Sequence, residues 1–376
     1  MFKKSSKVAV IGAGVLGTAI AYTIKKFFKN SVEVILIEKH SIPGQETSKF
    51  NSGVLHSGIH SKPDTLKAKF ARLGNLMAKD YCQRNGVPIN ECGMLIIAAY
   101  RDLVYLTKKI RNFWSIYNHG RQQNIKMKIL MPWEIPRIEP QVRGAGAIFI
   151  PDVAVIDQEK FVQSLFKSGK DLGVQMFLDT QVIGFRNIAG KYYVETDKLT
   201  IEADLVINAA GLYADEIAKL AGFDQYTIYP YRGEYYEVLG SDAKLVNRLV
   251  YPVPIEGDPG KGIHFLKTTD GRLLLGPNTR LVPNKEYYKQ DKTPAEVFRK
   301  AAVRFCPALK NAELKWAYSG IRPKLTLKDE FHHESDFIFS LDHQTPFFLN
   351  IIGYESPGLS GALAAAEYVK NILNKI

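Results

Sequence analysis

The stretch Val8-Ala-Val-Ile-Gly-Ala-Gly-Val-Leu-Gly-Thr-Ala-Ile-Ala-Tyr22 decides the fold of this chain. Its first four residues are apolar and predict a buried parallel strand. Gly12, Gly14 and Gly17 follow with the spacing G-x-G-x-x-G, and Thr18 to Phe28 predicts an amphipathic helix. Gly12 permits a tight turn, Gly14 lets a pyrophosphate approach the backbone, and Gly17 lets the helix and the strand pack closely. Phosphates would bind at the helix N-terminus, where unpaired N–H groups and the helix dipole favour negative charge.

A second apolar strand is expected over Val32 to Ile37, and it ends at Glu38. An acidic side chain at this point accepts hydrogen bonds from both ribose hydroxyls of an adenosine. The same charge would repel a 2′-phosphate, which argues against NADP. We therefore interpret the N-terminal segment as a dinucleotide site. The alternative is a glycine-rich turn in an ordinary α/β domain.

The composition is that of a globular protein, with 46% hydrophobic and 23% charged residues, and 376 residues allow two domains. The 50 basic and 38 acidic residues give a net charge of +12. Because Lys and Arg are dispersed along the chain, a nucleic acid partner is not expected. An anionic substrate, an anionic membrane surface or a Lys-rich proteome would each explain the charge.

The three cysteines, Cys82, Cys92 and Cys306, form no C-x-x-C pair and are odd in number. They indicate structural thiols in a reducing compartment. The basic N-terminus resembles a secretory signal, but its apolar run contains the three glycines and lacks a convincing cleavage site. No other window has 18 uninterrupted apolar residues, so no spanning helix is expected. We expect a cytoplasmic protein, and peripheral contact with the inner face of the membrane stays open.

Strand-turn-helix units with small residues at the turn occur at the start, near residue 205 and at the end of the chain. The second unit is Asp204-Leu-Val-Ile-Asn-Ala-Ala-Gly211, and the third joins the strand Phe347 to Ile352 to a helix through Gly353-Tyr-Glu-Ser-Pro-Gly-Leu-Ser-Gly361. Aromatic-rich antiparallel segments lie between these units. We therefore predict an α/β fold with two interleaved domains. A Rossmann-like domain comprises residues 1–82, 148–222 and 337–376, and a mainly antiparallel β-sheet substrate domain comprises residues 83–147 and 223–336.

Several short motifs carry a family resemblance over almost the whole chain. The more selective ones are Asn51-Ser-Gly-Val-Leu-His-Ser-Gly-Ile-His60 and the pair Tyr251-Pro-Val-Pro254 and Gly262-Ile-His-Phe265. On these motifs the chain resembles the FAD-dependent oxidoreductases of the D-amino acid oxidase and glycerol-3-phosphate dehydrogenase superfamily. The likeness is strongest to the L-2-hydroxyglutarate oxidase/dehydrogenase branch.

The resemblance implies FAD as the cofactor, and we expect it to be bound non-covalently. The segment 324–336 has no Cys, so the cysteinyl–flavin bond of the sarcosine oxidase branch is not expected. The C-terminal turn would present a helix N-terminus to the flavin N1–C2=O edge, where it stabilises the negative charge of the reduced ring. The residues that the resemblance implies for FAD binding are Gly12, Gly14, Gly17, Glu38, Thr47, Ser48, Asn51, Ser52, Ala210, Gly211, Gly353, Pro357, Gly358 and Leu359.

Gly320-Ile-Arg-Pro323 resembles the Gly-x-Arg-Pro motif of the amino acid oxidase branch. This likeness implies that Arg322 binds the substrate α-carboxylate, which a guanidinium can do bidentately. Arg232, on an aromatic-rich strand, is expected either to meet a second carboxylate or to form a structural salt bridge. Tyr235 and Tyr251 carry hydroxyls in the same region and are expected to bind substrate.

Hydride transfer from a hydroxy acid needs a base that takes the hydroxyl proton. His56 and His264 are the candidates, because His56 lies in the segment expected beside the flavin and His264 lies on a strand of the expected pocket. The alternative for each is a packed core histidine. We expect His60, His332 and His333 at the surface or in loops.

These observations favour FAD-dependent oxidation of L-2-hydroxyglutarate, or a related small anionic 2-hydroxy acid, to the 2-oxo acid. Hydride would pass to flavin N5, and the electrons would then pass to oxygen or to a membrane quinone. The first alternative is a flavoenzyme of the same fold that acts on glycerol 3-phosphate or an amino acid. The second is a non-catalytic flavin-binding assembly protein.

Overall fold

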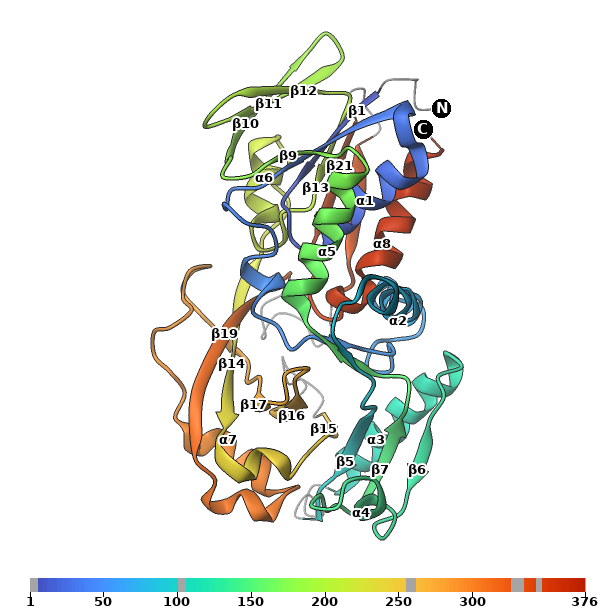
Figure 1. Cartoon of the computed structure of the whole chain (residues 1–376), viewed down its shortest axis with the longest axis vertical. Helices are drawn as coiled ribbons and strands as arrows, with labels where there is room; N and C mark the ends of the chain where they lie inside the picture. The colour runs from blue at the N-terminus through green and yellow to red at the C-terminus, as the bar shows by residue number, and fades with distance from the viewer. Residues whose placement is uncertain (1–5, 101–105, 255–261, 326–334, 343–346, 376) are drawn as a thin grey trace.

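The structure is a computed structural model that describes residues 6–100, 106–254, 262–325, 335–342 and 347–375. The chain forms two lobes stacked along the long axis of the molecule, and both ends of the chain lie at the outer end of the upper lobe (Figure 1). His332 and His333 lie outside the described residues. Within these residues no helix is long and apolar enough to cross a membrane.

The upper lobe is built on a six-stranded sheet with the strand order β20-β21-β13-β1-β2-β9. The four pairings from β21 to β9 are parallel, and β20 is antiparallel to β21. The strands are β1 (Ser6–Ile11), β2 (Val32–Ile37), β9 (Gln175–Phe177), β13 (Leu205–Asn208), β20 (Ile338–Asp342) and β21 (Phe347–Ile352).

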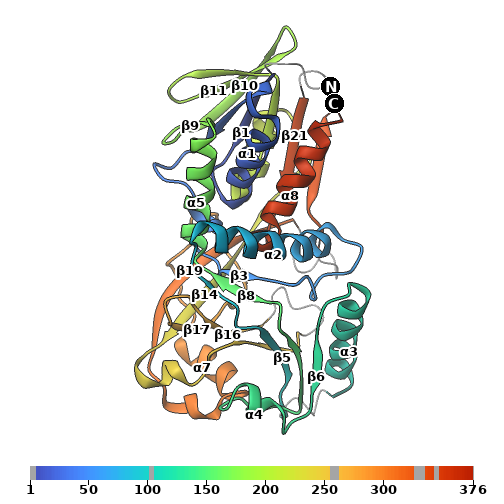
Figure 2. The same ribbon diagram turned by 45° about the vertical axis from the view of Figure 1, so that its right-hand side comes forward.

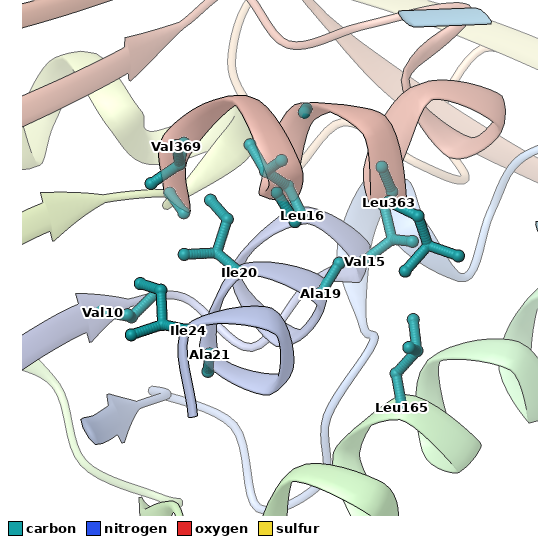
Figure 3. Packing of buried hydrophobic residues seen from close by; sticks show 14 of the residues in the cluster. Val10, Val15, Leu16, Ala19, Ile20, Ala21, Ile24, Leu165, Leu363 and Val369 are labelled. Atoms are coloured by element: carbon teal, nitrogen blue, oxygen red, sulfur yellow. The ribbon is translucent and has the colours of Figure 1, made fainter. Parts of the chain in front are cut away.

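Both faces of this sheet are covered, which is why its central strands are largely apolar. Val8 and Val10 of β1 face one core, whereas Ala9 and Ile11 face another. On the first face lie α1 (Val15–Phe28), α5 (Gln158–Asp171) and α8 (Gly358–Leu373), whose packed side chains are shown in Figure 3. On the second lie α6 (Ala214–Leu220) and a three-stranded meander of β10 (Val182–Ile188), β11 (Lys191–Thr196) and β12 (Thr200–Ala203).

The lower lobe is built on a nine-stranded, mainly antiparallel sheet. Its order is β18-β14-β17-β16-β15-β5-β7-β6, with β19 paired to β14. The strands are β5 (Met94–Ala98), β6 (Lys128–Leu130), β7 (Gly146–Ile150), β14 (Tyr229–Val238), β15 (Leu249–Pro252), β16 (His264–Lys267), β17 (Leu273–Gly276), β18 (Arg280–Leu281) and β19 (Leu314–Lys324). The helices of this lobe are α3 (Leu106–Gln122), α4 (Ile135–Ile138) and α7 (Ala295–Val303).

A junction of small elements connects the lobes (Figure 2). It consists of β3 (Val54–Leu55), β4 (Ile89–Asn90) and β8 (Ala154–Ile156), with α2 (Leu66–Asn85) across the base of the upper lobe. Helices α2 and α8 cross closely because Gly74 has no side chain; a Cβ there would lie 2.2 Å from the carbonyl oxygen of Ser360.

The predicted interleaved α/β fold is confirmed, but two of the predicted domain boundaries fall inside elements. The boundary after residue 82 falls inside α2, which ends at Asn85. The expected crossing at residue 148 falls inside β7, which belongs to the nine-stranded sheet. The chain therefore crosses back to the upper lobe after Ile150.

Candidate active site

A cavity of about 550 Å³ runs from the carboxyl ends of β1, β2 and β13 to the sheet of the lower lobe. Carboxyl ends of parallel strands are where open α/β sheets bind their ligands. The predicted FAD-binding and substrate residues line this cavity, with three exceptions, Gly17, Arg232 and Gly353.

The glycine turn after β1 has the geometry that a dinucleotide requires. Gly12 has a φ of +96°, and a Cβ there would lie 2.8 Å from the carbonyl oxygen of Ala209. A Cβ on Gly17 would lie 1.9 Å from the carbonyl oxygen of Gly12, so Gly17 sets the contact of α1 with the turn although it does not line the cavity. Bare backbone at the N-terminus of α1 can therefore approach a pyrophosphate closely.

Glu38 lies at the end of β2, as predicted, and its carboxylate is held by backbone groups. Oε2 accepts a hydrogen bond from the Ala13 N–H (2.7 Å) and Oε1 accepts one from the His40 N–H (2.9 Å). A carboxylate has about four lone-pair sites, so this anchored Glu38 retains acceptor capacity for ribose hydroxyls.

The loop that follows β2 brings polar side chains to the same cavity, but some of these side chains form hydrogen bonds with the protein itself. Ser48 Oγ accepts from the Val15 N–H at the start of α1 (2.9 Å). Thr47 Oγ1 donates to the Ile321 carbonyl (2.7 Å), and Asn51 Nδ2 donates to the Ser48 carbonyl (2.8 Å). Thr47 and Asn51 therefore join this loop to β19 and to itself, so they shape the cavity wall.

A second helix N-terminus, that of α8, opens on the cavity through Pro357, Gly358 and Leu359. Gly353 lies behind this wall, where its φ is +66° and a Cβ would lie 2.4 Å from Leu325 Cδ1. Two helix N-termini therefore open on one cavity. They suit a ligand that carries negative charge in its middle, as a pyrophosphate does, and an electron-rich group at one end. With Glu38 at the adenosine end, these residues fit FAD.

The lower-lobe end of the cavity is lined by Arg322, Tyr235, Tyr251, His56 and His264. These residues come from β14, β15, β16, β19 and the segment after β3, so the topology collects them from distant parts of the chain. Arg322 Nη1 donates to Thr279 Oγ1 (2.8 Å), which fixes one edge of the guanidinium.

Burial controls the protonation of Tyr235 and Tyr251, the two substrate candidates among the tyrosines that line the cavity. It raises the pKa of Tyr251 well above its ordinary value and also raises the pKa of Tyr235, with the positive charge of Arg322 partly opposing both shifts. Both side chains therefore keep their hydroxyl protons at neutral pH and can donate hydrogen bonds to an anionic ligand.

The two candidate bases are buried and firmly held. His264 stacks on Tyr251 with ring centroids 3.7 Å apart, and its Nδ1 lies 3.1 Å from the Gly262 carbonyl. Because a carbonyl only accepts, Nδ1 carries the proton and Nε2 is the acceptor of the neutral ring. The backbone N–H of His56 donates to Ser360 Oγ (2.8 Å), which ties His56 to α8.

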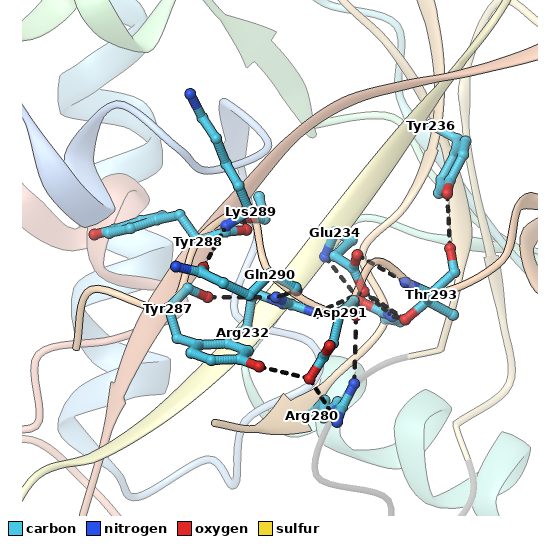
Figure 4. A network of polar contacts seen from close by, with 12 residues as sticks. Arg232, Glu234, Tyr236, Arg280, Tyr287, Tyr288, Lys289, Gln290, Asp291 and Thr293 are labelled. Atoms are coloured by element: carbon cyan, nitrogen blue, oxygen red, sulfur yellow. Dashed lines mark hydrogen bonds and ion pairs between the residues drawn. The ribbon is translucent and has the colours of Figure 1, made fainter. Parts of the chain in front are cut away.

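Arg232 occupies a different environment from the one expected for a substrate ligand. Its side chain is fully buried, and Nη2 donates to the Asp291 carbonyl at 2.8 Å and lies 3.5 Å from Glu234 Oε2. Figure 4 shows this network, in which the guanidinium holds the loop before Thr293. The structure therefore favours the structural salt bridge, because these contacts use the guanidinium away from the cavity.

Sequence reasoning missed two features of the site. His60 lies in a loop, as expected, but its position beside the candidate site was missed: its ring is 5.8 Å from that of Tyr251 and 6.2 Å from that of His56. The second feature is a buried ion cluster in which Glu355 contacts Lys67 and Lys324. Lys324 is two residues after Arg322 on β19, so the two-residue period of a strand was a usable signal for it.

Comparison with known proteins identifies the class of this site. The family model described as FAD dependent oxidoreductase matches residues 7–372. The chain belongs to the FAD-dependent oxidoreductase family. Its cofactor is FAD, as the fit of the cavity residues indicated.

Relatives of this flavoprotein carry two different substrate names. The chain is 31% identical to the glycerol 3-phosphate dehydrogenase of Caloramator mitchellensis, over 98% of this chain and 74% of the relative. It is 30% identical to the mitochondrial L-2-hydroxyglutarate dehydrogenase of Arabidopsis thaliana, over 98% of this chain and 83% of the relative. Among solved structures, the dithionite-reduced L-alpha-glycerophosphate oxidase of Mycoplasma pneumoniae with FAD bound superposes with a TM-score of 0.85. That match has 29% identity and covers 98% of this chain and 95% of that one.

Proposed function

We propose that this flavoenzyme oxidises L-2-hydroxyglutarate, or a closely related 2-hydroxy acid, to the 2-oxo acid. The observation that carries the proposal is the convergence of Arg322 with two buried imidazoles, His56 and His264, at one end of the cavity. A 2-hydroxy acid has a carboxylate next to its carbinol carbon. Its oxidation therefore needs a cation that binds the carboxylate and a base that takes the hydroxyl proton. The Arabidopsis relative named L-2-hydroxyglutarate dehydrogenase supports this choice of acid.

The proposed roles follow from the chemistry of each side chain. Arg322 binds the carboxylate, and the protonated Tyr235 and Tyr251 donate hydrogen bonds to the same anion. One imidazole takes the hydroxyl proton while the carbinol C–H bond breaks, so the substrate loses a proton and a hydride and becomes the 2-oxo acid. Bound FAD supplies the hydride acceptor, N5 of its flavin ring.

Glycerol 3-phosphate is the second candidate substrate. The Caloramator relative and the Mycoplasma structure carry glycerophosphate names at similar identity. A guanidinium also binds phosphate, so Arg322 alone does not discriminate between the two substrates.

Anaerobic bleaching of the flavin tests the substrate directly. Purified protein is mixed with L-2-hydroxyglutarate, D-2-hydroxyglutarate, L-lactate, glycerol 3-phosphate or an amino acid, and the loss of the visible flavin bands is recorded. Rapid bleaching by L-2-hydroxyglutarate is the expected result, and bleaching by glycerol 3-phosphate alone would replace the first proposal with the second. A flavoprotein that stays oxidised with every compound at millimolar concentration would contradict both.

The same assay separates the two candidate bases. Replacement of the true base, by His56→Asn or His264→Asn, is expected to slow bleaching by a factor of about 10² to 10⁴. The other variant is expected to change chiefly the substrate concentration needed for half-maximal rate.

We also propose that the electrons pass on to oxygen or to a quinone at an anionic membrane surface. The net charge of +12 supports attraction to anionic lipids. Reoxidation of the bleached protein by dissolved oxygen, compared with reoxidation by a soluble quinone, distinguishes the two acceptors.

A further inference from the structure

Three charged side chains form a buried cluster at the base of the α8 turn. Lys67 Nζ lies 2.8 Å from Glu355 Oε1, and Lys324 Nζ lies 3.7 Å from the same oxygen. Exposed fractions are 3% for Lys67, 6% for Glu355 and 9% for Lys324, so all three side chains are largely removed from solvent. They come from α2, β19 and the segment just before α8, which the fold brings together at one point.

The cluster borders the FAD cavity. Glu355 and Lys324 line the cavity together with Pro357 and Gly358 at the N-terminus of α8. Burial opposes ionisation of Glu355, but the ammonium groups of Lys67 and Lys324 outweigh it and lower its pKa to about 2. Both ammonium groups approach the same oxygen of Glu355, and Arg322 adds a further cation on the same strand as Lys324.

The N-terminus of α8 adds partial positive charge to the same wall. Charge placed near a bound flavin changes how readily the ring accepts electrons, because the reduced ring carries more negative charge than the oxidised ring.

We propose that the ion cluster of Lys67, Glu355 and Lys324 sets the reduction potential of the bound FAD. Lys324 and Lys67 favour the reduced cofactor, and Glu355 moderates their effect and holds both ammonium groups in position. The three are positioning residues for the electrostatics of the cavity. The proposal rests on the family's cofactor and not on the identity of the hydroxy acid, so it can succeed or fail independently of the proposed substrate.

The test measures the midpoint potential of the bound FAD by dye equilibration and the dissociation constant of sulfite, an anion that adds to oxidised flavins. Neither measurement requires the substrate. Glu355→Gln, which keeps the shape of the side chain, is expected to raise the potential and to tighten sulfite binding by about tenfold. Lys324→Met and Lys67→Met are expected to lower the potential and to weaken sulfite binding by a similar factor.

The signs of the shifts in midpoint potential decide the outcome. A purely structural cluster would give shifts of one sign, or no shift, in all three variants, and either result would overturn the proposal. The double variant Lys67→Met/Glu355→Gln removes one charge of each sign and is expected to return the potential towards that of the parent. If Lys67→Met does not fold, the opposite signs of Glu355→Gln and Lys324→Met still decide the question.

A matched control lies on the same helix as Lys67. Lys79 of α2 forms an ion pair of 2.9 Å with Glu91, and neither residue lines the cavity. Lys79→Met and Glu91→Gln change the net charge of the protein in the same way as the test variants. Both are expected to leave the potential and the sulfite dissociation constant unchanged.

Discussion

Individual atoms at Gly17 and Glu355 control two different properties of the cofactor site. At Gly17 the decisive quantity is space, because the backbone of the glycine turn occupies the position that a methyl group would need. At Glu355 it is charge, because two ammonium groups stabilise a carboxylate whose ionisation burial opposes. The first property concerns whether FAD binds, and the second concerns how it behaves once bound.

Gly17→Ala is expected to abolish stable FAD binding. Its Cβ would lie 1.9 Å from the carbonyl oxygen of Gly12, so the turn must move away from the position that lets it contact a pyrophosphate. The ratio of flavin to protein absorbance after gel filtration measures the loss. Gly169→Ala in α5 is the control, because a Cβ there meets only ordinary contacts of 3.5 Å and longer; equal flavin loss in both variants would contradict the expectation.

The ion cluster also predicts a pH dependence of stability. The pKa of Glu355 falls from an ordinary value of 4.5 to about 2 on folding, so its carboxylate stabilises the fold above pH 4.5 and loses that effect as the pH falls towards 2. Urea unfolding at several pH values should therefore show that the stability difference between the parent and Glu355→Gln shrinks as the pH drops through this window. A difference that stays constant with pH would rule out the ionised carboxylate as the source of stability.

At the scale of elements, the segment from Lys285 to Thr293 connects the two lobes beside the cavity. Lys285 Nζ lies 2.6 Å from Asp215 Oδ1 of α6, and the Tyr288 hydroxyl donates to Glu46, which lines the cavity. On its other side the segment is held by the buried Arg232 and by Glu234 Oε1, which accepts from the Thr293 N–H (3.0 Å). The network in Figure 4 thus fixes the segment to β14, while its tip contacts the upper lobe.

Tyr288→Phe is expected to speed the release of FAD by about fivefold, which corresponds to the loss of one hydrogen bond. The hydroxyl joins the segment to Glu46 on the cavity wall, and burial raises the pKa of Tyr288, so it stays a donor at any working pH. Dilution into an excess of an apoprotein that binds FAD tightly, and so captures the released cofactor, gives the rate. Tyr287→Phe serves as the control, because its hydroxyl bonds to Asp291 within the same segment; a similar rate for both variants would argue against the inter-lobe contact.

The strands and the contacts between them also show which features of the fold and the site could be predicted from the sequence. The apolar runs at β1, β2, β13 and β21 and the glycine turn after β1 predicted the Rossmann-like lobe, because both signals are local. The hydrogen-bond acceptors of Arg232 are backbone carbonyls of residues 287, 290 and 291, which carry no residue-specific signal. Lys67 and Glu355 are 288 positions apart, so nothing local marked them as a pair.

At the scale of the whole molecule, residues of both lobes line the cavity, from Gly12 in the upper lobe to Arg322 and His264 in the lower. A ligand that fills it touches both lobes, and it binds the folded chain but not the unfolded one. The stability of the molecule is therefore linked to the occupancy of the site.

Added FAD is expected to raise the unfolding free energy of the apoprotein by about 2.7 kcal/mol when its free concentration is 100 times the dissociation constant. Differential scanning calorimetry at increasing FAD concentrations measures the shift in Tm. Gly17→Ala, which is expected not to bind FAD, should show no shift at the same concentrations. A Tm of the parent that does not respond to FAD would contradict the linkage.

The positions of β21 and α8 in the chain have a consequence for biosynthesis. β21 completes the parallel sheet beside β13, and α8 packs against both α1 and α2 and supplies the second helix N-terminus of the cavity. During translation the glycine turn after β1 is synthesised more than 300 residues before these two elements. The nascent chain therefore carries an unfinished cofactor site over this interval, and the complete site can form only after α8 has been synthesised.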